Sequence, residues 1–206
     1  MAPTLVLLAH PHLEHSRVHR SLLQSLQQAG LPELEVRDLY ALYPDYLIDV
    51  PAEQAALARA RLVVWQHPLH WYGMPALMKL WVDEVLSFGW AYGPGGDHLR
   101  GKDLWLVTST GGSVHAYSEA GYNRHPFDHF MPPYAQTADL CGMRFLPPKV
   151  LHGAQRATAE ELQAFTQAYL TKLRRWPDWT LHLPLPEEFI LPVSGSDRPP
   201  AAAAAE

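Results

Sequence analysis

Histidines and a hydroxyl group gather near the N-terminus of this 206-residue chain. Four of its twelve histidines lie between His10 and His19, on either side of Ser16. Ser16 can cap a helix that begins directly after it, and the N–H groups at a helix N-terminus favour an anion such as a terminal phosphate. Imidazole groups can donate hydrogen bonds to that anion, or they can ligate zinc. The spacing therefore predicts an anion-binding loop or a metal site.

Two other stretches combine aromatic rings with glycine. Residues 68–75 (PLHWYGMP) contain Trp71 and Tyr72, and residues 109–117 (STGGSVHAY) contain two consecutive glycines. An aromatic surface and a closely approachable backbone suit a planar ring with polar edges. Both stretches are therefore candidates for binding a flat heterocycle.

The periodicity of apolar residues predicts five strands that alternate with five helices. The expected strands cover residues 4–9, 34–39, 62–66, 103–108 and 144–151, and the expected helices cover residues 16–29, 52–60, 75–86, 127–140 and 158–176. Pro132 and Pro133 are expected to interrupt the fourth helix, and two prolines confine the last strand to a sheet edge. The last helix opens with a capping box at Thr158 and Glu161.

This alternation predicts an α/β fold, a three-layer sandwich with a five-stranded parallel sheet in the flavodoxin-like order 2-1-3-4-5. In that order the carboxyl ends of the first, third and fourth strands lie side by side, where ligands bind. The three stretches described above follow these strands, whereas the loops after the second and fifth strands are expected to be plain. A phosphate subsite beside a surface for a flat ring describes flavin mononucleotide (FMN).

Composition sets limits on the kind of protein. Hydrophobic residues make up 48% and charged residues 18%, which excludes an intrinsically disordered chain. The net charge of −5 argues against a nucleic-acid binder. A single cysteine fits a reducing compartment, and no signal peptide or membrane span is expected, so we predict a cytoplasmic protein. Residues 1–178 are expected to form one FMN-binding domain, and residues 179–206 a Pro/Ala-rich tail with a disordered end.

Six segments of the chain resemble the flavodoxin-like family of NAD(P)H:quinone oxidoreductases, above all the small ancillary reductases of bacterial glutathione-regulated potassium-efflux systems. The segments are LAHPHLEHSRVHR, LYALYPD, VVWQHPLHWYGMPALMKLWVDEVL, GWAYGPGGDHLRGK, TSTGGSVHAY and CGMRFLPP. Each segment alone is a weak signal, but their joint order and spacing are specific.

The resemblance implies a set of site residues. The residues that align with cofactor-binding positions are His10, Ser16, Arg17, Val18, His19, Pro68, Leu69, His70, Trp71, Tyr72, Ser109, Thr110, Gly111 and Gly112. The family usually has asparagine at the position of His19 and glutamine at that of His70. Tyr117 aligns with a tyrosine that, in animal relatives, stabilises negative charge on the reduced flavin. Asn123 stands where those relatives have the histidine that partners this tyrosine.

The resemblance also implies an activity. NAD(P)H passes a hydride to flavin N5 and leaves, and a quinone or similar electrophile then receives two electrons in a ping-pong cycle. FMN is expected rather than FAD, because the chain lacks a segment that would hold an adenosine. A homodimer is implied because the second subunit closes the pocket in the family. A regulatory role on a membrane potassium-efflux protein, at the inner face of the membrane, is a second implied function.

A metal-dependent hydrolase is the third reading of the histidine-rich loop. His15 and His19 are four residues apart, and AHPHLEH is similar to an acidic AHPDDE-like run of zinc-dependent deacetylases. His12 and Leu13 stand where the carboxylates of that run would be. We therefore expect no metal in this site.

Overall fold

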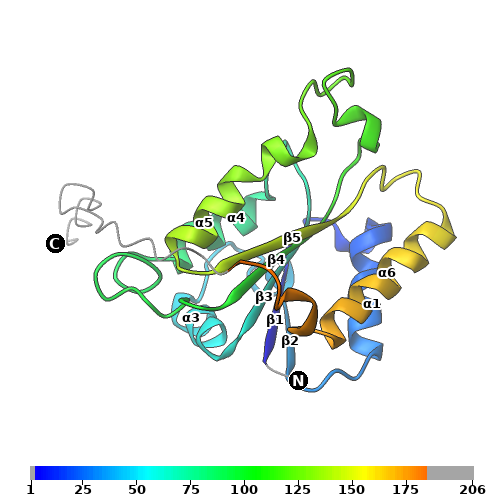
Figure 1. Cartoon of the computed structure of the whole chain (residues 1–206). Coiled ribbons are helices and arrows are strands. Elements are labelled where there is room, and N and C mark those ends of the chain that lie inside the picture. The colour runs from blue at the N-terminus through cyan, green and yellow to red at the C-terminus, as the bar shows by residue number, and fades with distance from the viewer. Residues whose placement is uncertain (1–2, 185–206) are drawn as a thin grey trace.

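Five parallel strands form one sheet between two layers of helices (Figure 1). The strands are β1 (Thr4–Leu8), β2 (Leu34–Asp38), β3 (Leu62–Pro68), β4 (Asp103–Ser109) and β5 (Arg144–Leu151). Their order, β2-β1-β3-β4-β5, confirms the predicted flavodoxin-like topology. This computed structural model describes residues 3–184, so residues 185–206, most of the predicted tail, lie outside it.

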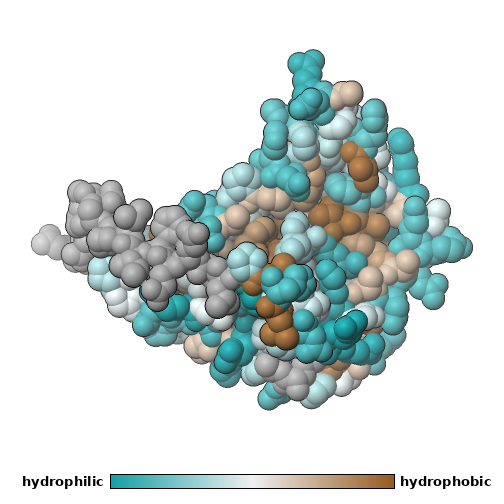
Figure 2. All heavy atoms as spheres, viewed as in Figure 1, coloured by the Kyte–Doolittle hydropathy of each residue, from teal (hydrophilic) through white to brown (hydrophobic). Residues whose placement is uncertain are grey.

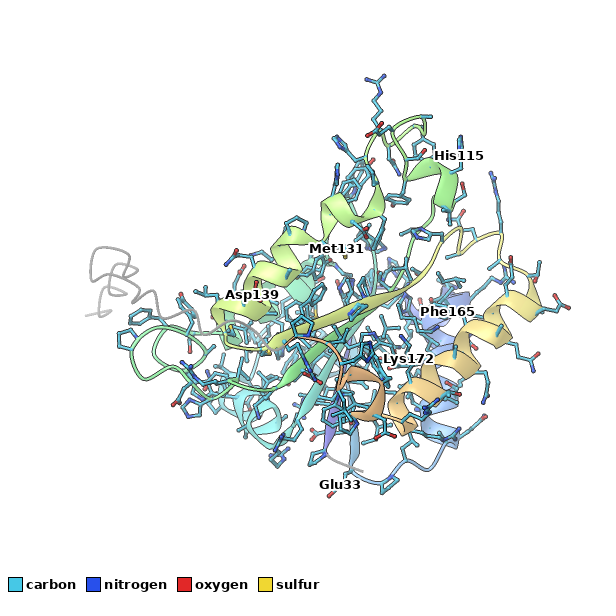
Figure 3. All side chains as sticks on the ribbon, viewed as in Figure 1. Glu33, His115, Met131, Asp139, Phe165 and Lys172 are labelled. Atoms are coloured by element: carbon cyan, nitrogen blue, oxygen red, sulfur yellow. The ribbon has the colours of Figure 1, made fainter. Side chains whose placement is uncertain are left out.

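Six α-helices cover the sheet in the part of the chain that is described. They are α1 (Arg17–Gln28), α2 (Leu39–Leu42), α3 (Val50–Arg59), α4 (Ala76–Val85), α5 (Pro132–Leu140) and α6 (Ala159–Arg174). Helices α1 and α6 cover one face of the sheet, and the other four helices cover the opposite face (Figure 1). Phe165 lies on α6 within the first of these layers, and Met131 lies at the start of α5 in the second (Figure 3).

The three central strands are buried along their whole length, because helices cover both of their faces. The edge strands β2 and β5 are partly exposed, and β5 accommodates Pro147 and Pro148 beside a register shift between Trp105 and Val107 of β4. Figure 2 shows hydrophobic residues gathered over the β5 edge, on a face that is otherwise mostly hydrophilic. The prediction that the prolines confine this strand to an edge is confirmed.

Two predicted elements differ from the structure. Pro132 and Pro133 begin α5 instead of interrupting a longer helix, and a separate 3₁₀ turn, η3, covers Phe127–Phe130. Proline is accepted in the first helical turn because the N–H that it lacks would have no partner there. Leu39 was predicted as a strand residue but begins the short helix α2, because the Asp38 side chain accepts a hydrogen bond from Ala41 N–H and caps it.

A buried carboxylate joins three elements on the α3 side of the sheet. Glu53 of α3 accepts hydrogen bonds from the Arg37 guanidinium of β2 at 2.6 and 2.8 Å, and also from the Tyr43 hydroxyl. Its second oxygen accepts the indole N–H of Trp81 in α4 at 2.9 Å. A buried charge is stable only when it is paired, so this network fixes β2 and α4 against α3.

Candidate functional site

The three predicted loops lie at one rim of the sheet, at the carboxyl ends of β1, β3 and β4. The backbone N–H of Ala9 donates to the Gln66 carbonyl at 3.0 Å, and that of Leu69 donates to the Ser109 carbonyl at 2.8 Å. This rim is the end of the sheet at which His115 lies, opposite the end at which Glu33 precedes β2 (Figure 3). Residues far apart in the sequence therefore share one edge of the molecule.

The first loop leads into α1 and leaves its N-terminus free of carboxylates. The Ser16 hydroxyl accepts the backbone N–H of His19 at 3.0 Å, which confirms the predicted cap. The side chain of Val18 is buried between α1 and the sheet. The Arg17 guanidinium donates to the carbonyls of Gln155 and Ala157 at 3.2 and 2.9 Å, so this predicted phosphate-loop residue ties α1 to the segment before α6. The remaining N–H groups of the first turn are available to an anion.

A cluster of imidazoles lines this loop. The ring of His10 lies 5.6 Å from that of His19 and 6.3 Å from that of His70. Burial, followed by the neighbouring histidines, lowers the pKa of His10 to about 4 and that of His19 well below its usual range. Burial also lowers the pKa of His70. All three rings are therefore neutral near pH 7 and offer dipoles and N–H donors instead of fixed positive charge.

The hydrogen bonds of two of these rings constrain their chemistry. His10 Nδ1 accepts the backbone N–H of His12 at 3.1 Å, so the proton of the neutral ring is on Nε2. His19 is 1% exposed, and its Nε2 lies 3.0 Å from the Ser109 hydroxyl. Its Nδ1 is buried and makes no hydrogen bond with any residue that the structure describes. A buried polar atom without a partner is energetically costly, so His19 Nδ1 is available to form a hydrogen bond with a ligand at this place.

The second loop presents an exposed tryptophan on a tight turn. His70 and Gly73 exchange two backbone hydrogen bonds of 3.0 Å, and both residues between them have positive φ, 47° for Trp71 and 65° for Tyr72. Positive φ is unusual for bulky residues and is common at functional sites. The Trp71 side chain is 95% exposed. Pro68, the last residue of β3, is buried beneath this turn.

The third loop follows β4 and is joined to the end of β5. The Thr110 hydroxyl donates to the Gly112 carbonyl at 2.7 Å and lies 3.0 Å from His152 Nδ1. A Cβ atom on Gly111 would meet no atom of residues 3–184 within 4 Å, so the backbone there is approachable, whereas one on Gly112 would lie 2.5 Å from the Tyr122 hydroxyl. Our expectation of a plain loop after β5 is wrong, because His152, the first residue after that strand, contacts the site.

Tyr117 lies at the side of this rim, among aromatic rings of η3 and His152. Its ring centroid is 5.7 Å from that of Phe127 and 5.5 Å from that of His152. Burial, followed by the phenols of Tyr122 and Tyr72, raises the pKa of Tyr117, so it is a neutral phenol at pH 7.

Asn123 does not pair with Tyr117. Its side-chain oxygen accepts the Tyr72 hydroxyl at 3.3 Å, which connects the second and third loops. The ring of His152 contacts that of Tyr117, and its Nδ1 lies within hydrogen-bond distance of Thr110 in the third loop. The sequence did not lead us to predict this histidine as a site residue. Its position directly after a strand that ends at the same rim is the signal that could have identified it.

Two further features of the described residues concern metal binding and membrane-spanning helices. Within residues 3–184, no group of three or more His, Cys, Asp or Glu side chains is arranged to hold a metal ion. Over the same residues, no helix is long and apolar enough to cross a membrane.

Comparisons with known proteins agree with this architecture. The family of proteins with a flavodoxin-like fold matches residues 2–173. The glutathione-regulated potassium-efflux system ancillary protein KefF of Citrobacter koseri is 46% identical over 175 residues, which cover 84% of this chain and 97% of the relative. The protein of the same name from Klebsiella aerogenes is 47% identical over 176 residues, 84% of this chain and 96% of the relative.

Two solved structures are similar over most of their length. General stress protein 14 of Treponema denticola, in complex with FMN, has a TM-score of 0.79 and 35% identity, covering 84% of this chain and 98% of that one. An NADPH-quinone reductase from P. pentosaceus has a TM-score of 0.73 and 25% identity, covering 81% and 95%. With the sheet order and the loops at its rim, these similarities show that the chain belongs to the flavodoxin-like NAD(P)H:quinone oxidoreductase family, in the group of the potassium-efflux ancillary proteins.

Proposed function

We propose that this chain binds FMN at the rim of β1, β3 and β4 and transfers hydride from NAD(P)H to quinones or similar small electrophiles. The observation that carries this proposal is the pairing of an anion subsite with a surface for a flat ring. The anion subsite consists of the free N-terminus of α1 and the unpaired Nδ1 of buried His19. The ring surface is formed by exposed Trp71 and the open backbone at Gly111. The FMN complex of a relative with 35% identity supports it.

The residues present fit this cofactor. A terminal phosphate would satisfy the amides of the first turn of α1 together with the imidazoles of His10 and His19. The turn at Trp71 and the backbone of residues 110–112 would hold the ring and its polar edge, because neither places a bulky side chain in front of Gly111. FMN rather than FAD remains our expectation. The subsite at the start of α1 is proposed to hold the terminal phosphate of the cofactor, and FMN ends at that phosphate whereas FAD continues to an adenosine.

The chain's own residues have distinct roles in the proposed reaction. When bound, FMN supplies hydride acceptance and donation at N5, which is the chemistry of the cofactor itself. Tyr117, a neutral phenol, can donate a hydrogen bond to negative charge that develops at the edge of the site. Asn123 orients Tyr72 through the hydrogen bond at 3.3 Å. The exposed ring of Trp71 positions the flat substrate and excludes water from one side.

A ping-pong cycle follows from one shared position for both substrates. The nicotinamide and the quinone are both planar and would use the same aromatic surface in turn. Parallel lines in double-reciprocal plots of NAD(P)H oxidation against benzoquinone would support this order, and intersecting lines would contradict it.

A homodimer is part of this proposal. Trp71, Tyr122 and Val114 border the rim and are 95%, 76% and 68% exposed. Apolar side chains exposed in this way next to a ligand site are typical of an interface, and a second copy of the chain would close the pocket over them. Sedimentation of the purified protein tests this, and a monomer at every concentration would contradict it.

The relatives favour a second, compatible role. Both curated relatives described above are ancillary proteins of a glutathione-regulated potassium-efflux system. We infer that this chain also contacts a potassium-efflux membrane protein from the cytoplasmic side. Bound flavin without any oxidation of NADH or NADPH by benzoquinone would favour this role over the enzymatic one.

The first experiment is the visible spectrum of the purified protein, before and after FMN is added. We expect flavin absorbance that remains with the protein on gel filtration, and release of FMN on denaturation. Protein that gains no flavin absorbance when FMN is added contradicts the proposal, and stoichiometric zinc would instead support a hydrolase.

A further inference from the structure

We propose that the phosphate subsite at the start of α1 takes up a proton when a phosphate monoester binds, and that His19 carries this proton. The inference rests on the proposed FMN site and deepens it, because it states the charge of the group that holds the phosphate. The observation behind it is a buried histidine with one unpaired ring nitrogen, near a helix N-terminus whose arginines are hydrogen-bonded to backbone carbonyls.

The arginines of the first turn of α1 are occupied elsewhere. Arg17 donates to the carbonyls of Gln155 and Ala157, and Arg20 donates to the carbonyl of Glu14 at 2.8 Å. A phosphate monoester carries a charge of about −1.5 to −2 at pH 7. The backbone amides alone supply about half a positive charge. A phosphate bound here would therefore lack a full counter-charge.

His19 is the imidazole best arranged to provide that charge. Its Nε2 lies 3.0 Å from the Ser109 hydroxyl, which can accept a hydrogen bond, and its Nδ1 has no partner in the described chain. A protonated imidazole donates from both nitrogens. Protonation would therefore preserve the contact with Ser109 and turn the unpaired Nδ1 into a donor for the phosphate.

The other titratable groups that face His19 are less suited to this role. Protonation of His10 at Nδ1 would remove the acceptor of the His12 N–H. His67 Nδ1 lies 2.9 Å from the Pro68 carbonyl, and its Nε2 is also buried without a partner in the described chain. However, its ring stacks on Tyr134 of α5, in the helix layer opposite α1, so it does not face the start of α1. His70 and His12 lie farther out, on exposed loop segments.

The direction of the pH effect follows from the electrostatics. In the free protein, burial and the rings of His10, His67 and His70 lower the pKa of His19, while Glu14 acts on His10 in the opposite sense. An anion within hydrogen-bond distance favours the charged imidazole and raises that pKa. Between the pKa of His19 in the free protein and its higher pKa in the complex, the complex binds a proton that the free protein lacks. Phosphate affinity therefore falls as the pH rises through this interval and levels off above the pKa in the complex.

The test compares FMN with riboflavin, which has the same ring and no phosphate. We expect the Kd of FMN, from flavin fluorescence titrations of the apoprotein, to rise by up to about tenfold per pH unit between pH 6.5 and 8.5. The Kd of riboflavin should stay constant over this range. Calorimetry of FMN binding in buffers with different ionisation enthalpies should show uptake of up to one proton, a measurement that needs no variant.

His19→Asn separates this role from a structural one. Asparagine can still donate a hydrogen bond to phosphate but cannot be protonated, so we expect FMN binding without the pH dependence and without proton uptake. His182→Asn, a change of an exposed histidine outside the site, should behave as wild type. FMN binding by the wild-type protein without proton uptake would overturn this inference and leave the proposed function intact. No FMN binding at any pH would overturn both.

Discussion

His152 Nδ1 lies 3.0 Å from the hydroxyl oxygen of Thr110, which joins the end of β5 to the loop after β4. The Thr110 hydroxyl directs its own proton to the Gly112 carbonyl, so its oxygen accepts from His152, whose proton must be on Nδ1. The histidine therefore holds the glycine-containing loop that faces the proposed ring site. Because both the neutral ring and the protonated ring donate from Nδ1, this restraint persists on acidification.

Removal of this hydrogen bond should weaken FMN binding. We expect His152→Leu to raise the Kd of FMN by about tenfold, the value of one hydrogen bond of this kind. His152→Asn keeps an N–H donor near the position of Nδ1 and should stay within about threefold of wild type. Fluorescence titration with FMN measures both. Thr110→Val should raise the Kd at least as much as His152→Leu, because it also removes the hydrogen bond to the Gly112 carbonyl. The double variant should add little to Thr110→Val, because both changes remove the same contact between Thr110 and His152. Equal losses in the Leu and Asn variants would contradict this role.

Trp71 should matter for activity and little for folding. Its side chain is 95% exposed, so we expect Trp71→Ala to change the free energy of unfolding by less than about 0.5 kcal/mol. Loss of an aromatic stacking surface should lower kcat/KM for benzoquinone by about tenfold. Urea unfolding and steady-state kinetics test the two parts. Leu181→Ala, which removes another exposed apolar side chain, should leave both quantities unchanged.

The buried His67 should make the apoprotein sensitive to acid. Burial lowers its pKa from 6.5 to about 4, so the unfolded chain binds more protons between these values. Stability should therefore fall as the pH drops from 6.5 to about 4, by up to about 3 kcal/mol from this group. In His67→Asn, which keeps a donor for the Pro68 carbonyl, the loss between pH 7 and pH 4 should be smaller.

Urea unfolding at several pH values measures this difference. The exposed His182→Asn variant should lose as much stability as wild type. An equal loss in His67→Asn and wild type would show that His67 stays unprotonated or is protonated without cost.

The Glu53 network should determine stability without affecting the cofactor. Glu53→Gln removes the buried counter-charge of the partly buried Arg37 guanidinium, and we expect a loss of about 3 kcal/mol in the free energy of unfolding. Glu35→Gln removes a partly exposed partner of the same arginine and should cost less than about 1 kcal/mol. Chemical denaturation gives both values. A change in the Kd of FMN for folded Glu53→Gln would contradict the separation of this network from the site.

Local patterns determined most of the architecture in advance. The strand and helix order, the cap at Ser16 and the box at Thr158 and Glu161 follow from residues within a few positions of one another. The switch point, and with it the meeting of the three loops, follows from the alternation of strands and helices. The exceptions, α2 and the start of α5, arose where a side-chain cap or a proline pair outweighed apolar periodicity.

The partners within the site were decided by the tertiary structure alone. His19 meets Ser109 across 90 residues and Thr110 meets His152 across 42, while Arg17 turns to the segment before α6 and Asn123 to Tyr72. The sequence predicted which loops converge, because unusual residues follow the first, third and fourth strands, whose carboxyl ends are neighbours in the order 2-1-3-4-5. It left open which side chains pair, because hydrogen bonds between loops depend on differences of an ångström in how separate elements pack.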